Sequence, residues 1–140
     1  MPRRPSIAYL DISCLIAAAL GEPGGGRLVG RLERYDRLLA SNVLEAEFRA
    51  TLVRERVTGA ADSWLSAITW VHPDRPLTAE LRRIAAAGPL AGTAMWHLAH
   101  ALYLAPDGKG LDFLTLDRRQ REIASALGLV TVELGSTRRR

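Results

Sequence analysis

Three acidic side chains stand where a folded chain has little structural use for them. Asp11 interrupts the apolar run "IAYLDI", Glu47 lies within "NVLEAEFRATLVRERV", and Asp117 ends "DFLTLD". Carboxylates that meet at one place raise one another's pKa unless a divalent cation neutralises them. Mg²⁺ and Mn²⁺ prefer such oxygen ligands, activate water and stabilise charge on a phosphoryl group. A cluster of these acids would therefore point to hydrolysis of phosphodiesters.

Asp11 falls in a stretch that should be apolar throughout, because a strand buried on both faces of a parallel sheet reads as continuous Val, Ile and Leu. Ligands of such sheets bind beyond the carboxyl ends of the strands. The alternative role is a cap for the helix expected from residue 14, but Ser13 lies closer to that helix and could cap it. We therefore favour a functional Asp11.

Glu47 shares its helix with a second glutamate of different character. At about 100° per residue, Glu45, Arg49 and Arg56 fall on one solvent face, and Glu45 with Arg49 is a favourable surface pair. Glu47 points to the opposite side, where an unpartnered carboxylate is costly. Its expected neighbours there are Val43, Ala50 and Val53. Arg54 lies on the same side and is the alternative, purely structural partner, but we favour a functional Glu47.

Asp117 permits two interpretations. With Gln120 three residues later it makes a plausible capping box for the next helix, and it also stands at the end of a predicted strand, where a metal ligand is expected. Arg118 and Arg119 begin the same helix and could contact phosphate, although a solvated helix face is the alternative. The sequence leaves both questions open.

Two histidines lie on the apolar segment "GTAMWHLAHALYLA". His97 and His100 are three residues apart and lack the HExxH pattern of a zinc helix. We expect them to pack or to form buried hydrogen bonds rather than to bind zinc.

The elements that must position these residues follow from an alternation of short apolar runs with segments of helical period. Strands are predicted at 7–12, 37–41, 70–73, 112–116 and 130–134. Helices are predicted near 14–20, 26–36, 43–57, 62–69, 77–87, 93–105 and 118–127. This pattern is typical of an α/β protein: a three-layer α/β/α sandwich with a central parallel sheet of about five strands. Residues 1–134 would form the domain and residues 135–140 a basic tail, while "GEPGGG" at 21–26 is expected to be a turn rather than a phosphate loop.

Composition limits the possibilities further. The chain has 140 residues and is 48% hydrophobic, which is typical of one globular domain, and with Cys14 as its only cysteine it can form no intrachain disulfide. Three of its four net positive charges belong to residues 138–140, so the rest is nearly neutral and RNA binding must be argued from the site. No apolar run approaches the roughly 20 residues that span a bilayer, and we expect a cytoplasmic protein without membrane contact.

Four motifs follow one another along the chain: "YLDISCLIAAAL", "LLASNVLEAEFRATLVRE", "MWHLAHALYL" and "FLTLDRRQREIASALGL". In order and spacing they resemble the PIN domain, in particular the VapC-type ribonuclease toxins of toxin–antitoxin operons. The resemblance implies a PIN-like parallel sheet between helices, a homodimer, an antitoxin partner, and RNA cleavage with Mg²⁺ or Mn²⁺ held by four acids. By matching positions it assigns catalytic and metal-binding roles to Asp11, Glu47 and Asp117.

The third acid of that pattern is missing. In sequences of this kind an Asp opens the helix that continues with Trp-His-Leu-Ala, and here Ala94 takes its place. Either the chain carries an inactivating substitution, natural or introduced, or its lineage has become a non-catalytic PIN-like module that binds an antitoxin or itself. Both explanations predict weak metal binding and low nuclease activity. A phospho-receiver domain would need a second acid beside Asp11 and a lysine on the last strand, and the sequence provides neither.

Overall fold

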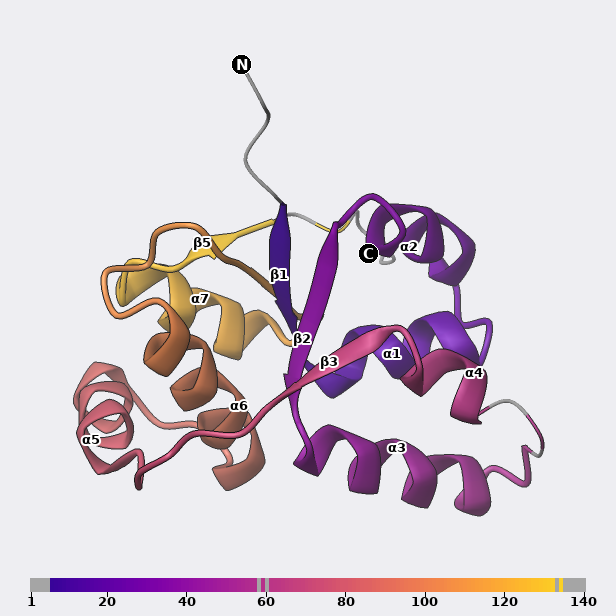
Figure 1. The fold of residues 1–140 in the computed structure, drawn as a ribbon, viewed down its shortest axis with the longest axis horizontal. Helices are drawn as coiled ribbons and strands as arrows, with labels where there is room; N and C mark the ends of the chain where they lie inside the picture. Colours follow the sequence, from indigo (N-terminus) through magenta and orange to yellow (C-terminus); the bar gives the residue numbers. More distant parts are fainter. Residues whose placement is uncertain (1–5, 58, 60, 133, 135–140) are drawn as a thin grey trace.

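A parallel sheet is the centre of the structure. The computed structural model describes residues 6–57, 59, 61–132 and 134, in which five strands pair in the order β3-β2-β1-β4-β5 (Figure 1). Every pairing is parallel. The strands are β1 (Ile7–Leu10), β2 (Arg37–Ser41), β3 (Ile68–Val71), β4 (Asp112–Leu114) and β5 (Val130–Thr131). With helices on both faces, this confirms the predicted α/β/α sandwich.

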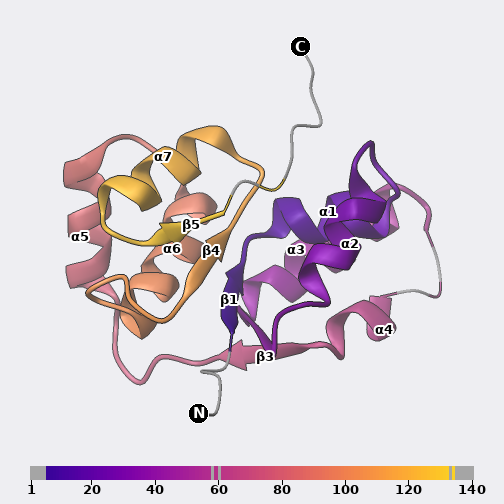
Figure 2. The same ribbon diagram turned by 90° about the horizontal axis from the view of Figure 1, so that it is seen from above.

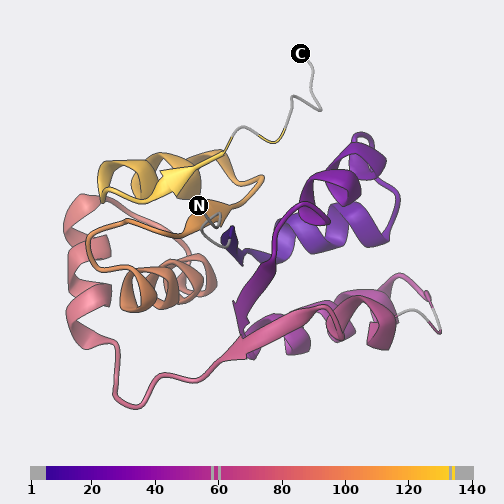
Figure 3. The same ribbon diagram turned by 45° about the horizontal axis from the view of Figure 1, so that its top comes forward.

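The helices form two groups on opposite sides of the sheet (Figure 2 and Figure 3). One group consists of α1 (Ile12–Ala19), α2 (Gly25–Leu32), α3 (Val43–Arg54) and α4 (Ala61–Leu65). The other consists of α5 (Thr78–Ala87), α6 (Gly92–Leu104) and α7 (Arg118–Ala126). Each group buries its own apolar core against the sheet. Within the described residues, none of these helices is long and apolar enough to cross a membrane.

The central strand β1 contributes to both cores because its side chains alternate between the two faces. Ala8 and Leu10 belong to the core under α1–α4, Tyr9 belongs to the core under α5–α7, and all three are fully buried. The strand ends at Leu10 rather than at residue 12, because Asp11 is the N-cap of α1 and accepts a hydrogen bond from the Ser13 amide. The expectation that Ser13 would be the cap is therefore wrong.

Strand β2 has the predicted bounds, whereas the ends of β3, β4 and β5, which stops at Thr131 rather than at residue 134, and of two helices differ from the prediction. Strand β3 lies two residues earlier than expected, and β4 stops at Leu114 because the chain then turns into the cap of α7. Helices α2 and α4 end at Leu32 and Leu65, short of the predicted 36 and 69, because β2 and β3 begin soon after them. The predicted domain boundary remains a prediction, since residues 135–140 lie outside the described part of the chain.

The glycine-rich turn between α1 and α2 has a steric function. A side-chain Cβ on Gly25 would lie 2.5 Å from the backbone oxygen of Ala17, so only glycine lets the two helices approach this closely. Gly24, the N-cap of α2, has the left-handed φ of 84° that glycine adopts without strain. This junction confirms that the segment is a turn.

Candidate functional site

The carboxyl edge of the sheet is where the predicted acids gather. Helices α1, α3 and α7 start directly after β1, β2 and β4, so their first turns meet at this edge. Asp11 and Asp117 are the N-caps of α1 and α7, and Glu47 lies in the second turn of α3. Capping and a functional role are therefore compatible for both aspartates.

Asp11 is buried, with 5% of its surface exposed, and it is held by neutral donors. Its Oδ2 accepts from the Ser13 amide at 3.0 Å and from the Thr115 hydroxyl at 3.4 Å, and its Oδ1 accepts from Gln120 Nε2 at 3.2 Å. No ion pair among the described residues involves Asp11. Within the described part of the chain, these hydrogen bonds to the Asp11 carboxyl group thus come from neutral donors.

Glu47 ends a chain of hydrogen bonds that crosses the core. The Ser41 amide donates to the Tyr9 hydroxyl at 2.9 Å, that hydroxyl lies 2.9 Å from His97 Nδ1, and His97 Nε2 lies 2.6 Å from Glu47 Oε1. Burial raises the pKa of Tyr9 well above its ordinary value, so its hydroxyl keeps a proton that it can donate to Nδ1. In the tautomer in which Nδ1 accepts this bond, Nε2 donates to Glu47.

This arrangement corrects the expected surroundings of Glu47. Arg54 does not pair with it but contacts the Thr51 hydroxyl at 3.3 Å, and Val53 is 77% exposed rather than inward. The buried face of α3 is formed by Leu44, Phe48 and Leu52. Glu47 lies at the flank of that face, where α6 supplies its partner.

Glu45 is a surface residue, as predicted. Arg49 lies 2.7 Å from it and also reaches Asp62, and the hydrogen bond from Arg49 holds the pKa of Glu45 below its usual range.

The expected hydrogen bonding of the two histidines is also confirmed: His97 and His100 are buried, and His100 Nδ1 lies 2.8 Å from the Trp96 carbonyl oxygen.

Glu47 and Asp117 line one open pocket of about 630 Å³. Its lining residues are Ile12, Ser13, Ile16, Glu22, Glu47, Ala50, Thr51, Arg54, Leu116 and Asp117. Asp11 and Ala94 are absent from this lining, so the structure brings two of the three predicted acids to an accessible surface and leaves the first one behind it. The basic residue of the pocket is Arg54.

Arg118 and Arg119, the predicted phosphate contacts, do not line this pocket. Arg118 Nε lies 3.3 Å and Arg119 Nη1 lies 3.9 Å from the carboxylate of Glu122, one turn further along α7. These are exposed pairs of the kind that contributes little to stability. The structure thus favours the solvated helix face for both arginines.

The described residues do not form a metal site as they are arranged. No three His, Cys, Asp or Glu side chains in this part of the chain lie close enough to hold one ion. Asp11 is engaged by neutral donors, Glu47 is engaged by His97, and residue 94 has a methyl group where a carboxylate is expected. The oxygen chemistry suits Mg²⁺ or Mn²⁺, but the set of ligands is incomplete.

Comparison with protein families agrees with this architecture. The family model of the PIN domain matches residues 8–126. The chain belongs to the PIN-domain family. The match includes all three predicted acids and residue 94, and it confirms the resemblance found in the sequence.

Two solved structures share this PIN fold. VapBC-1 from nontypeable Haemophilus influenzae is 17% identical, with 91% of this chain and 98% of that chain covered and a TM-score of 0.69. VapBC2 from Rickettsia felis, bound to a DNA fragment from their promoter, is 13% identical, with 90% and 97% covered and a TM-score of 0.65. At these identities the likeness establishes the fold. A search of the curated proteins found no match.

Three residues of the PIN site did not emerge from the sequence as parts of it. Tyr9 is part of an apolar run, His97 was expected to pack or to form a buried hydrogen bond, and Gln120 was expected to be half of a capping box. A signal existed for His97, because an inward glutamate without a cation on its own helix needs a donor from another element. Tyr9 and Gln120 act through contacts 88 and 109 residues apart in the sequence, which periodicity does not report.

We predict that Tyr9→Phe lowers the free energy of unfolding by about 1–3 kcal/mol, because it leaves the buried Ser41 amide and His97 Nδ1 without their shared partner. The measurement is urea denaturation at neutral pH. Tyr103→Phe is the matched control, since its hydroxyl bonds the exposed Asp74 and its loss is expected to cost under about 1 kcal/mol. Equal losses in the two variants would contradict the role of Tyr9.

Proposed function

We propose that this PIN-domain protein is the ribonuclease toxin of a toxin–antitoxin pair, an Mg²⁺- or Mn²⁺-dependent enzyme whose cleavage of RNA is impaired in the chain as written. The observation that carries this proposal is the incomplete acidic edge: Asp11, Glu47 and Asp117 gather at the carboxyl ends of the strands, and Ala94 lacks the carboxylate that would complete them. We place the protein in the cytoplasm and expect a homodimer, both as predictions.

The residues of the pocket have distinct tasks in this proposal. Glu47, fixed by His97, and Asp117, fixed at the start of α7, set two carboxylates on the wall of the pocket. Asp11, outside the lining of the pocket, is the third carboxyl group at this edge of the sheet. Arg54 is the cation of the same pocket, and its guanidinium suits a phosphate of the RNA backbone. We therefore propose Arg54, rather than Arg118 or Arg119, as the phosphate contact.

The first test restores the missing acid. We predict that Ala94→Asp strengthens Mn²⁺ binding and raises Mn²⁺-dependent cleavage of a total RNA pool by orders of magnitude, because a neutral site gains a charged oxygen ligand. Calorimetry and gel analysis of the RNA measure the two effects. Ala91→Asp, at the exposed residue before α6, is the matched control for added charge and should change neither. A folded Ala94→Asp protein without any gain would refute the proposed nuclease.

The second test concerns the phosphate contact. In the Ala94→Asp background, we predict that Arg54→Gln raises KM for a short RNA about tenfold, the loss of about 1.4 kcal/mol expected for one phosphate contact. Arg118→Gln removes the same charge outside the pocket and should change KM less than about twofold. The assignment of Arg54 is wrong if the two substitutions have equal effects.

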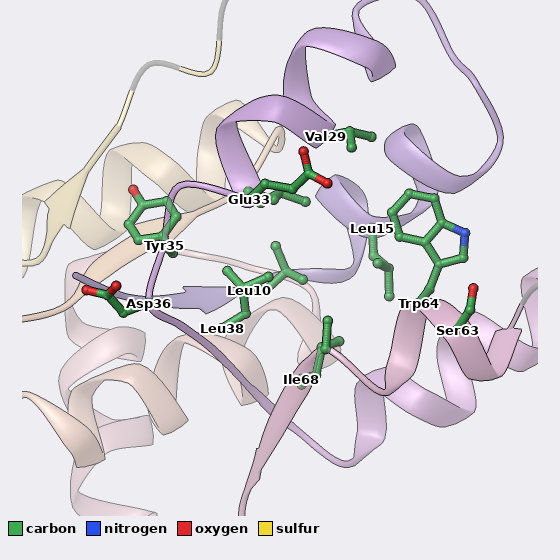
Figure 4. Close-up of a pocket in the computed structure, with 12 residues that line it drawn as sticks. Leu10, Leu15, Val29, Glu33, Tyr35, Asp36, Leu38, Ser63, Trp64 and Ile68 are labelled. Atoms are coloured by element: carbon green, nitrogen blue, oxygen red, sulfur yellow. The ribbon is translucent and has the colours of Figure 1, made fainter. Parts of the chain in front are cut away.

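The alternative function, a module that binds an antitoxin, is favoured by a second pocket. An apolar groove of about 410 Å³ lies between α1, α2 and α4 (Figure 4), and it shares no lining residue with the acidic pocket. Val29, Leu38 and Trp64 expose apolar surface in it, and Glu33 and Asp36 lie on its rim. Two proteins of similar fold are known as VapBC pairs. We propose that the groove binds an amphipathic antitoxin segment whose basic residues face the rim.

To test this, Val29→Asp is introduced and the tagged chain is co-expressed with the product of the neighbouring gene. We predict that the variant no longer co-purifies with that protein, because a carboxylate would have to be buried in the interface. Ile16→Asp, in the acidic pocket, is the matched control and should still co-purify. Retention by both variants would exclude the groove as the contact surface. Circular dichroism confirms that each variant is folded.

A further inference from the structure

Gln120 is the least expected side chain of the site. It is fully buried in the first turn of α7. Its Nε2 donates to Asp11 Oδ1 at 3.2 Å and to the backbone oxygen of Ala94 at 3.0 Å. Its Oε1 is the buried side-chain oxygen that lacks a hydrogen-bond partner among the described residues. A buried carbonyl oxygen without a partner destabilises the fold by about 1–3 kcal/mol. The contacts of the N–H₂ group must therefore offset this cost.

The local structure of α7 shows that this side chain is not used for capping. In a capping box the residue at this position reaches back to the backbone N–H of the N-cap. Only half of the box is present: the backbone N–H of Gln120 donates to Asp117 Oδ1 at 3.1 Å. The Asp117 N–H donates instead to the Thr115 hydroxyl at 3.0 Å. The side chain of Gln120 is therefore free to cross to Asp11 and α6.

The electrostatics of Asp11 explain what the amide does there. A buried carboxylate without a cation is stable only when dipoles point at it. The start of α1 supplies one side of this environment through the Ser13 amide, and Gln120 supplies the other through its N–H₂ group. The oxygen of Asp11 that Gln120 contacts is the one that neither Ser13 nor Thr115 bonds.

The same amide also contacts the residue at which the acid is missing. The carbonyl group of Ala94 belongs to the first turn of α6, and it shares Nε2 of Gln120 with Asp11. The neutral residue 94 and the bound Asp11 are thus joined by one side chain. The arrangement is consistent with a site that balances its charges without a metal ion.

We propose that Gln120 is a positioning residue that takes the place of a cation at Asp11: its amide donates a hydrogen bond to the buried carboxylate and competes with metal for it. This inference rests on the proposed function only for the identity of the competing ion, a divalent cation. It explains why the chain is folded with an incomplete acidic site. It also implies that Gln120, in addition to Ala94, weakens metal binding at the site.

The experiment is a double-mutant cycle on the full chain, read as the midpoint of thermal unfolding in EDTA and in 1 mM MnCl₂. Gln120→Met keeps the length of the side chain and removes the amide. In EDTA we expect it to lower the midpoint by about 5 °C in the otherwise unchanged chain and by less than about 2 °C with Asp11→Asn, whose neutral side chain no longer needs the dipole. A loss of the same size in both backgrounds would overturn the proposal.

Gln120→Glu supplies the second readout, which a purely structural role would not move. It keeps the shape of the side chain and places a second carboxylate beside Asp11. We therefore expect a lower midpoint of thermal unfolding in EDTA, and a midpoint about 5 °C or more higher in MnCl₂ than in EDTA. The unsubstituted chain, and Gln120→Glu combined with Asp11→Asn, should respond to Mn²⁺ by less than about 2 °C. Equal Mn²⁺ responses in all three proteins would overturn the proposal.

These outcomes are independent of RNA cleavage. If Gln120→Met does not fold, the Mn²⁺ response of Gln120→Glu, purified in the presence of MnCl₂, decides the question alone. If the cycle shows coupling but Ala94→Asp produces no nuclease, the role of Gln120 stands and the proposed enzyme fails. If Ala94→Asp produces a nuclease but the cycle shows no coupling, the enzyme stands and Gln120 only fills space.

Discussion

The burial of negative charge at the carboxyl edge of the sheet is the constraint on which this site depends. Strand β1 is covered on both faces, so the residue that follows it, Asp11, starts its helix inside the protein with 5% of its surface exposed. A carboxylate in such a place must be neutralised or surrounded by donors. In this chain donors surround it, and they come from α1, the end of β4 and α7. The packing of those elements is therefore tied to one side chain.

Glu47 meets the same constraint in a different way. Its carboxylate is partly accessible, and one oxygen is held by His97, whose tautomer is set by the Tyr9 hydroxyl. Asp117 is exposed and uses Oδ1 to cap α7. The three acids thus range from buried to exposed, and each one has protein partners. In the proposed nuclease these carboxylates would share a cation, whereas here Asp11 and Glu47 are bonded by Gln120 and His97 and residue 94 has no carboxylate. This difference is the physical basis of the proposed impairment.

The fold was predictable from the sequence because its signals are local. Short apolar runs between helical periods are enough to indicate a parallel sheet with two helical layers. The errors were confined to strand and helix ends, and at β1 and β4 the boundary is decided by the caps Asp11 and Asp117. The direction of Glu45 and Glu47 on α3 also follows from the helical period. The helical period does not show which element covers each face of α3. Val53 was therefore expected to be buried, although it is 77% exposed. The contacts of Tyr9, His97 and Gln120 join distant segments, so only the folded structure reveals them.

The most direct measurement of the central claim is a crystal structure of the Ala94→Asp chain grown with MnCl₂, in which anomalous scattering locates the ion. The account predicts one Mn²⁺ peak at the carboxyl edge of the sheet, within coordination distance of the introduced carboxylate and of Asp11, with the amide of Gln120 displaced from Asp11. It is contradicted if the introduced carboxylate is ordered, Gln120 still bonds Asp11 and no Mn²⁺ peak lies at this edge.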